Sequence, residues 1–249
     1  MAVQLYVKEK NQIKKKVKTY VSYFTITAGS LLLFWAFYPV VSFEIYSRFF
    51  IQKNLITPVP IAQAASPVEL ANSVLGNSSI FSNNLRDFTQ ASLWFPTNQI
   101  QDSQKKIDVT GYQLSIPKLN IEKASVNVGG EDLSKSLIHY IPTSSPGENG
   151  NVVIFGHSTL PQLYNPKDYK TIFTYLPSLE KGDKILVKIK NLNYEYEVYE
   201  MFVIKPDQIS VLSQRYDAPY LTLITCVPPG TYWNRLVVRA KLTKLPTEL

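Results

Sequence analysis

Hydrophobic and polar positions divide this chain into two unlike parts. Thr19–Phe43 runs for 25 residues without a charged side chain, and a helix needs roughly 20 apolar residues to cross the hydrocarbon core of a bilayer. Aromatic residues gather toward the end of this run, as they do at a membrane interface. The stretch is too long and too evenly apolar for a buried amphipathic helix. The pattern therefore predicts one transmembrane helix over 19–43.

Beyond Thr110 the pattern changes to short runs that are rich in β-branched and aromatic residues and bounded by Pro, Gly, Asn or Asp. In 194–198, Tyr and Val alternate with Glu, so one face of a strand is apolar and the other polar. Asp132–Leu137 and Asp168–Leu179 are predicted to be short helices. The predicted strands are Gly111–Ile116, Ile121–Val128, Asn151–Phe155, Lys184–Ile189, Tyr194–Ile204, Tyr220–Cys226 and Leu236–Leu242. So many short strands predict an all-β domain, either a closed barrel or a sandwich.

The segment between these two parts, about 52–108, is rich in Ser, Asn, Gln, Pro and Ala and has no sustained hydrophobic period. It is predicted to be a spacer, although Trp94 and Phe95 are apolar enough to fold back on the domain. The expected organisation is a basic tail over 1–18, the transmembrane helix over 19–43, the spacer over 44–109 and the β domain over 110–249.

Charge sets the orientation of this arrangement. The chain carries a formal net charge of +7, and its first twenty residues hold six lysines against Glu9, a net of +5. A positive segment before an apolar span stays in the cytoplasm, so the β domain is predicted to lie outside the membrane. The apolar run exceeds the roughly 7–15 residues of a cleaved signal peptide, which favours an uncleaved signal anchor. Because most of the excess positive charge lies in the N-terminal tail, it does not indicate a nucleic-acid-binding surface on the β domain.

Cys226 is the only cysteine, which excludes a disulfide scaffold. It ends the predicted strand TLITC, and Pro-Pro-Gly follows almost at once. A lone thiol is a packing residue, half of an intermolecular bridge or a nucleophile. His157 ends another apolar strand in the same way, in NVVIFGHS, with Gly156 leaving room beside it. A histidine can activate a thiol and later protonate the leaving amine.

Arg235 begins the strand that follows Cys226, so antiparallel pairing would bring its guanidinium beside the thiol, where an oxyanion needs a cation. Arg239 lies about 13 Å further along a strand and cannot reach the same carbonyl. A solvent-exposed face shared by Arg235, Arg239 and Lys241 remains an alternative. His139 is expected to be a satisfied loop histidine. No metal-ligand spacing or glycine-rich phosphate loop is present, so no metal or cofactor is expected.

Together these motifs resemble the sortases, membrane-anchored cysteine transpeptidases of bacterial surfaces. The resemblance rests on PGENGNVVIFGHS, on TLITC and on RLVVRAKL, in that order, and covers roughly Tyr112 to Leu242. It implies a closed eight-stranded β-barrel with short helices after one N-terminal transmembrane helix. The proline-rich segment after the cysteine is more similar to the non-housekeeping classes of the family than to the housekeeping class.

The resemblance also implies the chemistry. Cys226 would attack the Thr–Gly bond of an LPxTG-like sorting signal on a surface protein, and an amine on a cell-wall precursor or a pilin would resolve the thioacyl enzyme. His157 would be the general acid and base, Arg235 the binder of substrate backbone or oxyanion, and Thr225 a residue close to the substrate. The enzyme would be a single-pass membrane protein with its catalytic domain outside the cytoplasm.

Two other functions compete with this one. Papain-like proteases and L,D-transpeptidases also use Cys and His, but the former place the cysteine first. The latter carry a glycine before the cysteine, where this chain has Thr225. A membrane-tethered β-barrel that binds a ligand without catalysis is the alternative from another class, and it would leave Cys226 inert.

Overall fold

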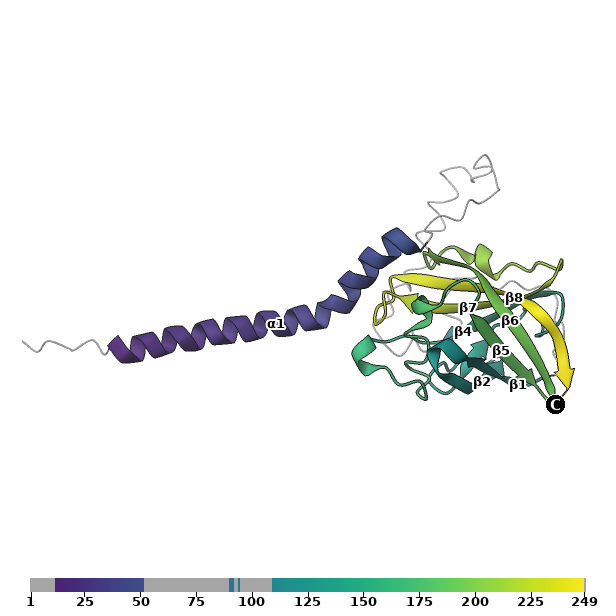
Figure 1. Ribbon diagram of the computed structural model, residues 1–249, viewed down its shortest axis with the longest axis horizontal. Helices are drawn as coiled ribbons and strands as arrows, with labels where there is room; N and C mark the ends of the chain where they lie inside the picture. Colours follow the sequence, from purple (N-terminus) through teal and green to yellow (C-terminus); the bar gives the residue numbers. More distant parts are fainter. Residues whose placement is uncertain (1–11, 52–89, 92–93, 95–108, 249) are drawn as a thin grey trace, which may run out of the picture.

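A computed structural model describes residues 12–51, 90–91, 94 and 109–248 (Figure 1). The predicted spacer, apart from its ends and Gln90, Ala91 and Trp94, and most of the basic tail lie outside the described residues. A long helix, α1 (Gln12–Phe50), precedes a β domain. The strands are β1 (Gly111–Ile116), β2 (Ile121–Val128), β3 (Leu137–His139), β4 (Gly150–Phe155), β5 (Lys184–Ile189), β6 (Leu192–Ile204), β7 (Pro219–Val227) and β8 (Asn234–Glu248). Four 3-10 helices join them: η4 (Pro117–Leu119), η5 (Pro161–Leu163), η6 (Leu176–Ser178) and η7 (Ile209–Leu212).

The eight strands close into a barrel in the order β1-β2-β3-β4-β7-β8-β6-β5. Six of the neighbouring pairs are antiparallel, whereas β2–β3 and β4–β7 are parallel. Closure leaves no sheet edge exposed, which suits a domain with so many short strands. The predicted all-β, eight-stranded barrel after one N-terminal helix is therefore confirmed, and a sandwich is excluded.

All seven predicted strands form, but two predicted helices do not. Over 132–137 the Asp132 carboxylate accepts hydrogen bonds from the backbone N–H and the hydroxyl of Ser134, which makes a turn. Leu137 then begins β3, a strand not predicted. Residues 168–179 form consecutive turns that end in η6, because Asp168 bonds to the N–H of Lys170 and Pro177 cannot continue a helical ladder.

Side chains on the two faces of the barrel wall form two separate clusters. The interior cluster includes Val152 and Ile154 of β4, Leu221 and Leu223 of β7, and Leu236 of β8. The alternate residues of these strands point outward and form a second cluster, which we call the outer cluster. Its members are Ala91, Trp94, Leu133, Ile138, Val153, Phe155, Phe202, Ile204, Val211, Leu212, Ile224, Cys226 and Val237. One outer side of the barrel is therefore covered by two parts of the chain: the segment that includes η7, and Trp94.

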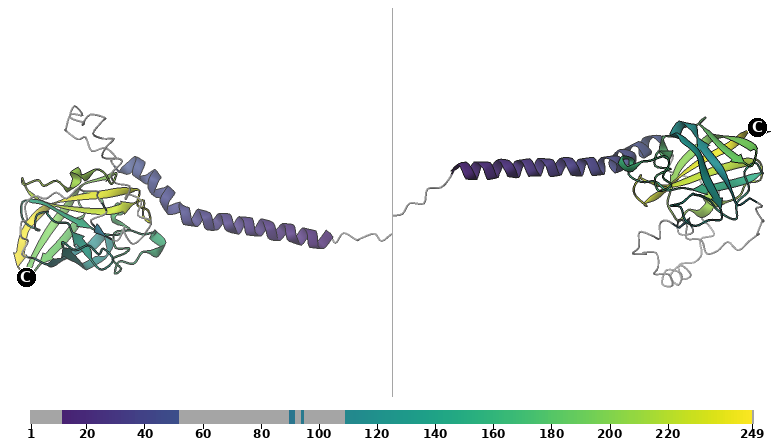
Figure 2. Two further views of the ribbon diagram at one scale, coloured as in Figure 1. Left: turned by 180° about the vertical axis from the view of Figure 1, so that it is seen from behind. Right: turned by 90° about the horizontal axis from the view of Figure 1, so that it is seen from below.

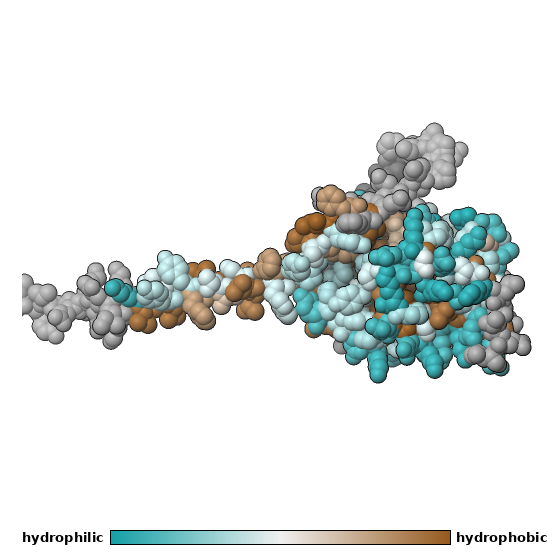
Figure 3. Space-filling model, in the orientation of Figure 1, coloured by the Kyte–Doolittle hydropathy of each residue, from teal (hydrophilic) through white to brown (hydrophobic). Residues whose placement is uncertain are grey.

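The long helix α1 has an apolar, exposed first part and a docked last part. Lys16–Ser47 is long and apolar enough to cross a membrane, and hydrophobic residues follow one another along it in Figure 3. The side chains that are buried against the barrel lie on one helical face, because they follow one another at intervals of four residues. They are Phe43, Ser47 and Ile51. Both views in Figure 2 show the rest of α1 extending away from the barrel.

Figure 1 shows that α1 changes direction before it reaches the barrel. The helix contains Pro39, and a proline inside a helix causes such a bend. A proline has no N–H, so the carbonyl four residues earlier, that of Trp35, loses its helical hydrogen bond. The side-chain amide of Gln162, in η5 of the barrel, donates to this carbonyl at 3.2 Å. The barrel thus supplies the bond that the proline removes, and the junction between helix and barrel is a specific contact.

Candidate active site

The ends of two parallel strands bring His157 and Cys226 to one place. In the β4–β7 register Phe155 lies opposite Ile224. His157 follows Phe155 by two positions, and Cys226 follows Ile224 by two positions. The hydroxyl of Ser158 donates to the carbonyl oxygen of Cys226 at 2.6 Å, which fixes the two segments side by side. Ser158 was not singled out in the sequence, although it directly follows the Gly-His pair.

Arg235 reaches the same place from β8. The antiparallel β7–β8 register puts it directly opposite Cys226, so the pairing predicted from the sequence is present. Arg239 is instead occupied elsewhere on the strand, with its guanidinium 3.2 Å from the Glu200 carboxylate and 5.0 Å from the centre of the Phe202 ring. The two arginines therefore do not share one solvent-exposed face: Arg235 is buried, with 3% of its surface exposed.

These side chains also share one face of the barrel wall. Successive residues of a strand point to opposite faces, and Ile224 and Val237 belong to the outer cluster. Cys226 belongs to it too, and Arg235 is two residues from Val237 on β8. His157 continues the outward alternation of Val153 and Phe155. Nucleophile, base and cation candidates thus meet on the outer face at one end of the barrel.

Trp94 covers this meeting point. Only 1% of its surface is exposed. Its ring lies 5.7 Å from the His157 ring and 5.3 Å from the Arg235 guanidinium carbon, between centres. Its backbone carbonyl accepts a hydrogen bond from Nη2 of Arg235 at 3.3 Å. The sequence indicated Trp94 as able to fold back on the domain, but not where it would land; Phe95 lies outside the described residues.

Burial under this cover keeps the candidate pair neutral. It raises the pKa of the Cys226 thiol to about 11, although the charge of Arg235 acts in the opposite direction. Burial also lowers the pKa of His157 to about 4, against a smaller opposing effect of Asp132. Within the described part of the chain, Nε2 of His157 is buried without a hydrogen-bond partner. The thiol and the imidazole are therefore both uncharged at rest near neutral pH, beside the charged Arg235, and one imidazole nitrogen is available for proton transfer.

The remaining predicted site residue, Thr225, takes a different position. It alternates with Cys226 and is fully buried, and its hydroxyl donates to the carbonyl of Gly156 at 2.8 Å. This bond ties the strand of the cysteine to the Gly-His segment. Gly156 itself must lack a side chain, because a Cβ there would lie 2.4 Å from Cδ2 of Phe173. Both residues hold the two strand ends together.

His139 lies at the end of β3 and not in a loop as predicted, but its nitrogens are satisfied. Nδ1 is 3.0 Å from the Tyr112 hydroxyl and Nε2 is 2.9 Å from the Thr143 hydroxyl. Its burial lowers its pKa to about 4. His139 therefore belongs to a buried polar network away from the candidate site. Among the described residues no group of three or more His, Cys, Asp or Glu side chains could hold a metal ion.

The two buried histidines should make the fold sensitive to acid. Each folded-state pKa, about 4, lies below the unfolded value of about 6.5, so the unfolded chain binds more protons between these values. The stabilisation is complete above pH 6.5 and is lost as the pH falls toward 4. We expect each histidine to lower the free energy of unfolding by about 2 kcal/mol between pH 6.5 and 4.5.

Denaturant unfolding of the full chain in detergent, at several pH values, measures this loss. His139→Gln serves as the matched variant, because carboxylates titrate equally in both proteins and cancel in the comparison. The variant should lose less stability over the same interval. Equal pH slopes for the two proteins would show that His139 is not the buried neutral group described here.

Comparison with known proteins agrees with this geometry. The family model described as "Sortase domain" matches residues 114–243, slightly more than half of the chain. Sortase D of Bacillus subtilis is 30% identical over 116 residues, which are 46% of this chain and 53% of the relative. Sortase A of Bacillus anthracis is 29% identical over 133 residues, 52% of this chain and 58% of the relative. The chain thus covers little more than half of the length of these two relatives.

Solved structures give similar matches. A sortase D5 transpeptidase of Clostridium perfringens is 28% identical, with a TM-score of 0.47 over 54% of this chain and 79% of that one. Sortase C-1 of Actinomyces oris is 28% identical, with a TM-score of 0.48 over 54% of this chain and 73% of that one. The matched range includes at least part of every strand of the closed barrel, and it contains the GH and TLITC segments that carry the candidate site. This chain belongs to the sortase family.

Proposed function

We propose that this protein is a membrane-anchored cysteine transpeptidase that cuts surface proteins at a sorting signal and joins them to an amine. The observation that carries the proposal is the convergence of Cys226, His157 and Arg235 on one face, at one end of three adjacent strands. A thiol, an imidazole and a guanidinium are the three groups that acyl transfer through a thioester needs. No cofactor takes part.

In the first half of the reaction His157 takes the proton of the Cys226 thiol, and the resulting thiolate attacks the carbonyl carbon of a Thr–Gly bond. The carbonyl oxygen becomes an oxyanion that Arg235 stabilises. His157 then gives its proton to the glycine nitrogen, the C–N bond breaks, and a thioester to Cys226 remains. In the second half an amine attacks the thioester, His157 accepts its proton, and the Cys226 thiolate leaves. His157 then returns that proton to the sulfur, which restores the neutral resting pair.

The contact between Arg235 and Trp94 supports the role of the arginine. Nη1 of Arg235 is held by the carbonyl oxygens of Tyr232 and Asn234, at 3.1 and 3.3 Å. Nη2 donates to a further carbonyl, that of Trp94. A guanidinium that already binds a carbonyl beside the thiol is suited to bind that of a substrate, once Trp94 has moved away. Thr225 is proposed to lie beside the bound substrate through its backbone, because its side chain is buried on the opposite face from Cys226 with its hydroxyl on Gly156.

The apolar part of α1 supports membrane anchorage. Lysines precede it, so the N-terminus is proposed to be cytoplasmic and the barrel extracytoplasmic. In that orientation the catalytic barrel meets surface proteins that carry a C-terminal LPxTG-like sorting signal. The acceptor is proposed to be an amine of a cell-wall precursor or of a pilin lysine.

A transpeptidation assay tests this function. The full chain in detergent is incubated with a panel of LPxTG-like peptides and a small amine, and products are identified by mass spectrometry. We expect cleavage between Thr and Gly, an amine adduct of the N-terminal fragment, and loss of both products in Cys226→Ala. A folded protein that forms neither a product nor a thioester with any peptide would contradict the proposal and favour a non-catalytic binding module.

A further inference from the structure

The position of the barrel relative to the bilayer follows from α1. From Lys18 to Tyr38 the helix rises about 30 Å, the thickness of the hydrocarbon core. With Lys18 at the inner boundary, the outer boundary therefore falls near Tyr38. The Gln162 amide contacts the carbonyl of Trp35, so η5 of the barrel lies at this same level. Its Leu163 is 64% exposed, as an apolar side chain that touches lipid would be.

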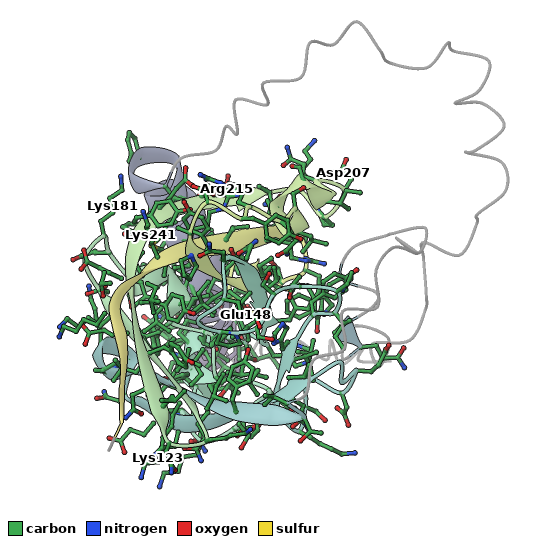
Figure 4. All side chains as sticks on the ribbon, turned by 90° about the vertical axis from the view of Figure 1, so that its right-hand side faces the viewer. Lys123, Glu148, Lys181, Asp207, Arg215 and Lys241 are labelled. Carbon is green, nitrogen blue, oxygen red and sulfur yellow. The ribbon has the colours of Figure 1, made fainter. Side chains whose placement is uncertain are left out.

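The end of the barrel that carries the candidate site therefore faces the bilayer. η5 begins four residues after His157, and the loop after Cys226 packs against the same segment, since a Cβ on Gly230 would lie 2.7 Å from Leu160. Figure 1 shows the loops at this end turned toward the apolar part of α1. Glu148 lies two residues before β4 and so at the opposite end of the barrel, the end that faces the viewer in Figure 4.

A groove runs between the docked part of α1 and this end of the barrel. Its volume is about 680 Å³, within the range of roughly 300–1,000 Å³ that ligand sites have. The helix contributes Tyr38, Phe43 and Tyr46, and the barrel contributes Tyr175, Pro177 and Pro229. Most of this lining is apolar, and Ser42, Thr174 and Ser178 add hydroxyl groups. Glu180, which also lines it, is paired with Lys118 at 3.2 Å.

The groove continues into the bilayer. A second groove of about 520 Å³ lies on α1 itself, lined by Leu31, Leu32, Phe34 and Trp35. The two grooves share Tyr38 and Gln162. An apolar path therefore leads from the part of the helix inside the membrane to the loop that follows Cys226. At this depth the abundant apolar molecules are lipid chains.

We propose that this composite groove binds an acyl chain of a phospholipid from the outer leaflet, with the hydroxyls of Ser42 and Ser178 near its polar end. The proposal depends on α1 spanning the bilayer and not on the catalytic chemistry. A bound chain would fill the space between α1 and the barrel. It would also line one side of the approach to Cys226, through Pro229.

Photo-crosslinking to lipid tests the site. The full chain is placed in nanodiscs of phosphatidylethanolamine and phosphatidylglycerol that contain a phospholipid with a diazirine on one acyl chain. After irradiation, labelled peptides are mapped by mass spectrometry. We expect label on the barrel residues 174–178, in addition to the label that any membrane helix acquires. Leu163 should also be labelled, because it touches the bilayer surface.

Two matched variants show whether the label on 174–178 requires the groove or only requires that these residues lie close to the membrane. Ser178→Trp fills the groove from η6, whereas Ser210→Trp places the same side chain on an exposed serine of η7, which does not line it. We expect Ser178→Trp to lower the label on 174–178 at least fivefold and to leave the label on Leu163 unchanged. Ser210→Trp should change neither.

Two results would overturn the proposal: label confined to α1, or label on 174–178 that Ser178→Trp does not reduce. The measurement is repeated with Cys226→Ala, which should be labelled as the unmodified protein is. Because crosslinking needs no turnover, failure of the lipid site leaves the transpeptidation assay unaffected, and failure of that assay leaves the lipid site unaffected.

Discussion

Replacing Trp94 with alanine is expected to speed the alkylation of Cys226 by about 100-fold near neutral pH. The reactive form of a cysteine is its thiolate, and burial in the outer cluster, which includes Trp94, raises the pKa of this thiol to about 11. Removing the ring admits water and returns the pKa toward about 8.5–9, which increases the thiolate fraction roughly 100-fold. The pKa of His157 should rise at the same time from about 4 toward its ordinary value.

Iodoacetamide labelling, followed by mass spectrometry across a range of pH, measures this effect. Cys226 is the only thiol in the chain, so the total labelling reports it alone. Trp94→Phe keeps an aromatic ring over His157 and the backbone carbonyl that Arg235 binds, and its rate should stay within about threefold of the unmodified protein. Equal rates for Trp94→Ala and the unmodified protein would mean that the tryptophan does not control access to the thiol.

Replacing Arg235 with alanine is expected to lower the rate of transpeptidation by 100- to 1,000-fold. Removing one donor from an oxyanion site typically costs this much in kcat, and Arg235 is the cation opposite Cys226 in the β7–β8 register. Because the charge that it stabilises develops only in the transition state, kcat should fall far more than KM rises. Arg235→Lys should recover only part of the loss, since an ammonium lacks the planar fork of a guanidinium.

Arg239→Ala provides the matched control for this prediction. It removes the same side chain from the same strand, four residues further on, where the guanidinium contacts Glu200 and Phe202 and not the thiol. Peptide turnover by this variant should stay within about threefold of the unmodified protein, and thermal unfolding should show that both variants are folded. A comparable loss of kcat in the two variants would contradict the proposal that Arg235 stabilises the oxyanion.

Much of the barrel could be predicted because most of its strands have a hydrophobic pattern that is recognisable in their own residues. Alternation in 194–198 is sufficient to predict β6, and β-branched runs predict β4 and β7. β3 could not be predicted in this way, because it has only three residues and forms through pairing with β2 on one side and β4 on the other. The sequence predicts a helix from Asp132. A turn forms in its place, because the Asp132 carboxylate accepts hydrogen bonds from Ser134 that compete with helical ones.

The candidate site shows the same division between local and distant signals. Cys226 and His157 could be singled out because each ends an apolar strand, and Arg235 because a short connection implies antiparallel pairing with the strand of the cysteine. The cover over these residues could not be predicted. Trp94 comes from a segment without a periodic pattern, and its position depends on contacts with His157 and Arg235 that no local rule encodes.

The burial of Cys226 has a consequence for its survival in the extracytoplasmic location proposed above. Peroxides and other oxidants attack thiolates, and the first product, a sulfenic acid, can be oxidised further to acids that are not readily reduced. A thiol with a pKa of about 11 is almost entirely protonated at neutral pH. The resting enzyme would therefore keep its sulfur in the reduced state in an oxidising environment, and would expose it to oxidation only while the site is uncovered.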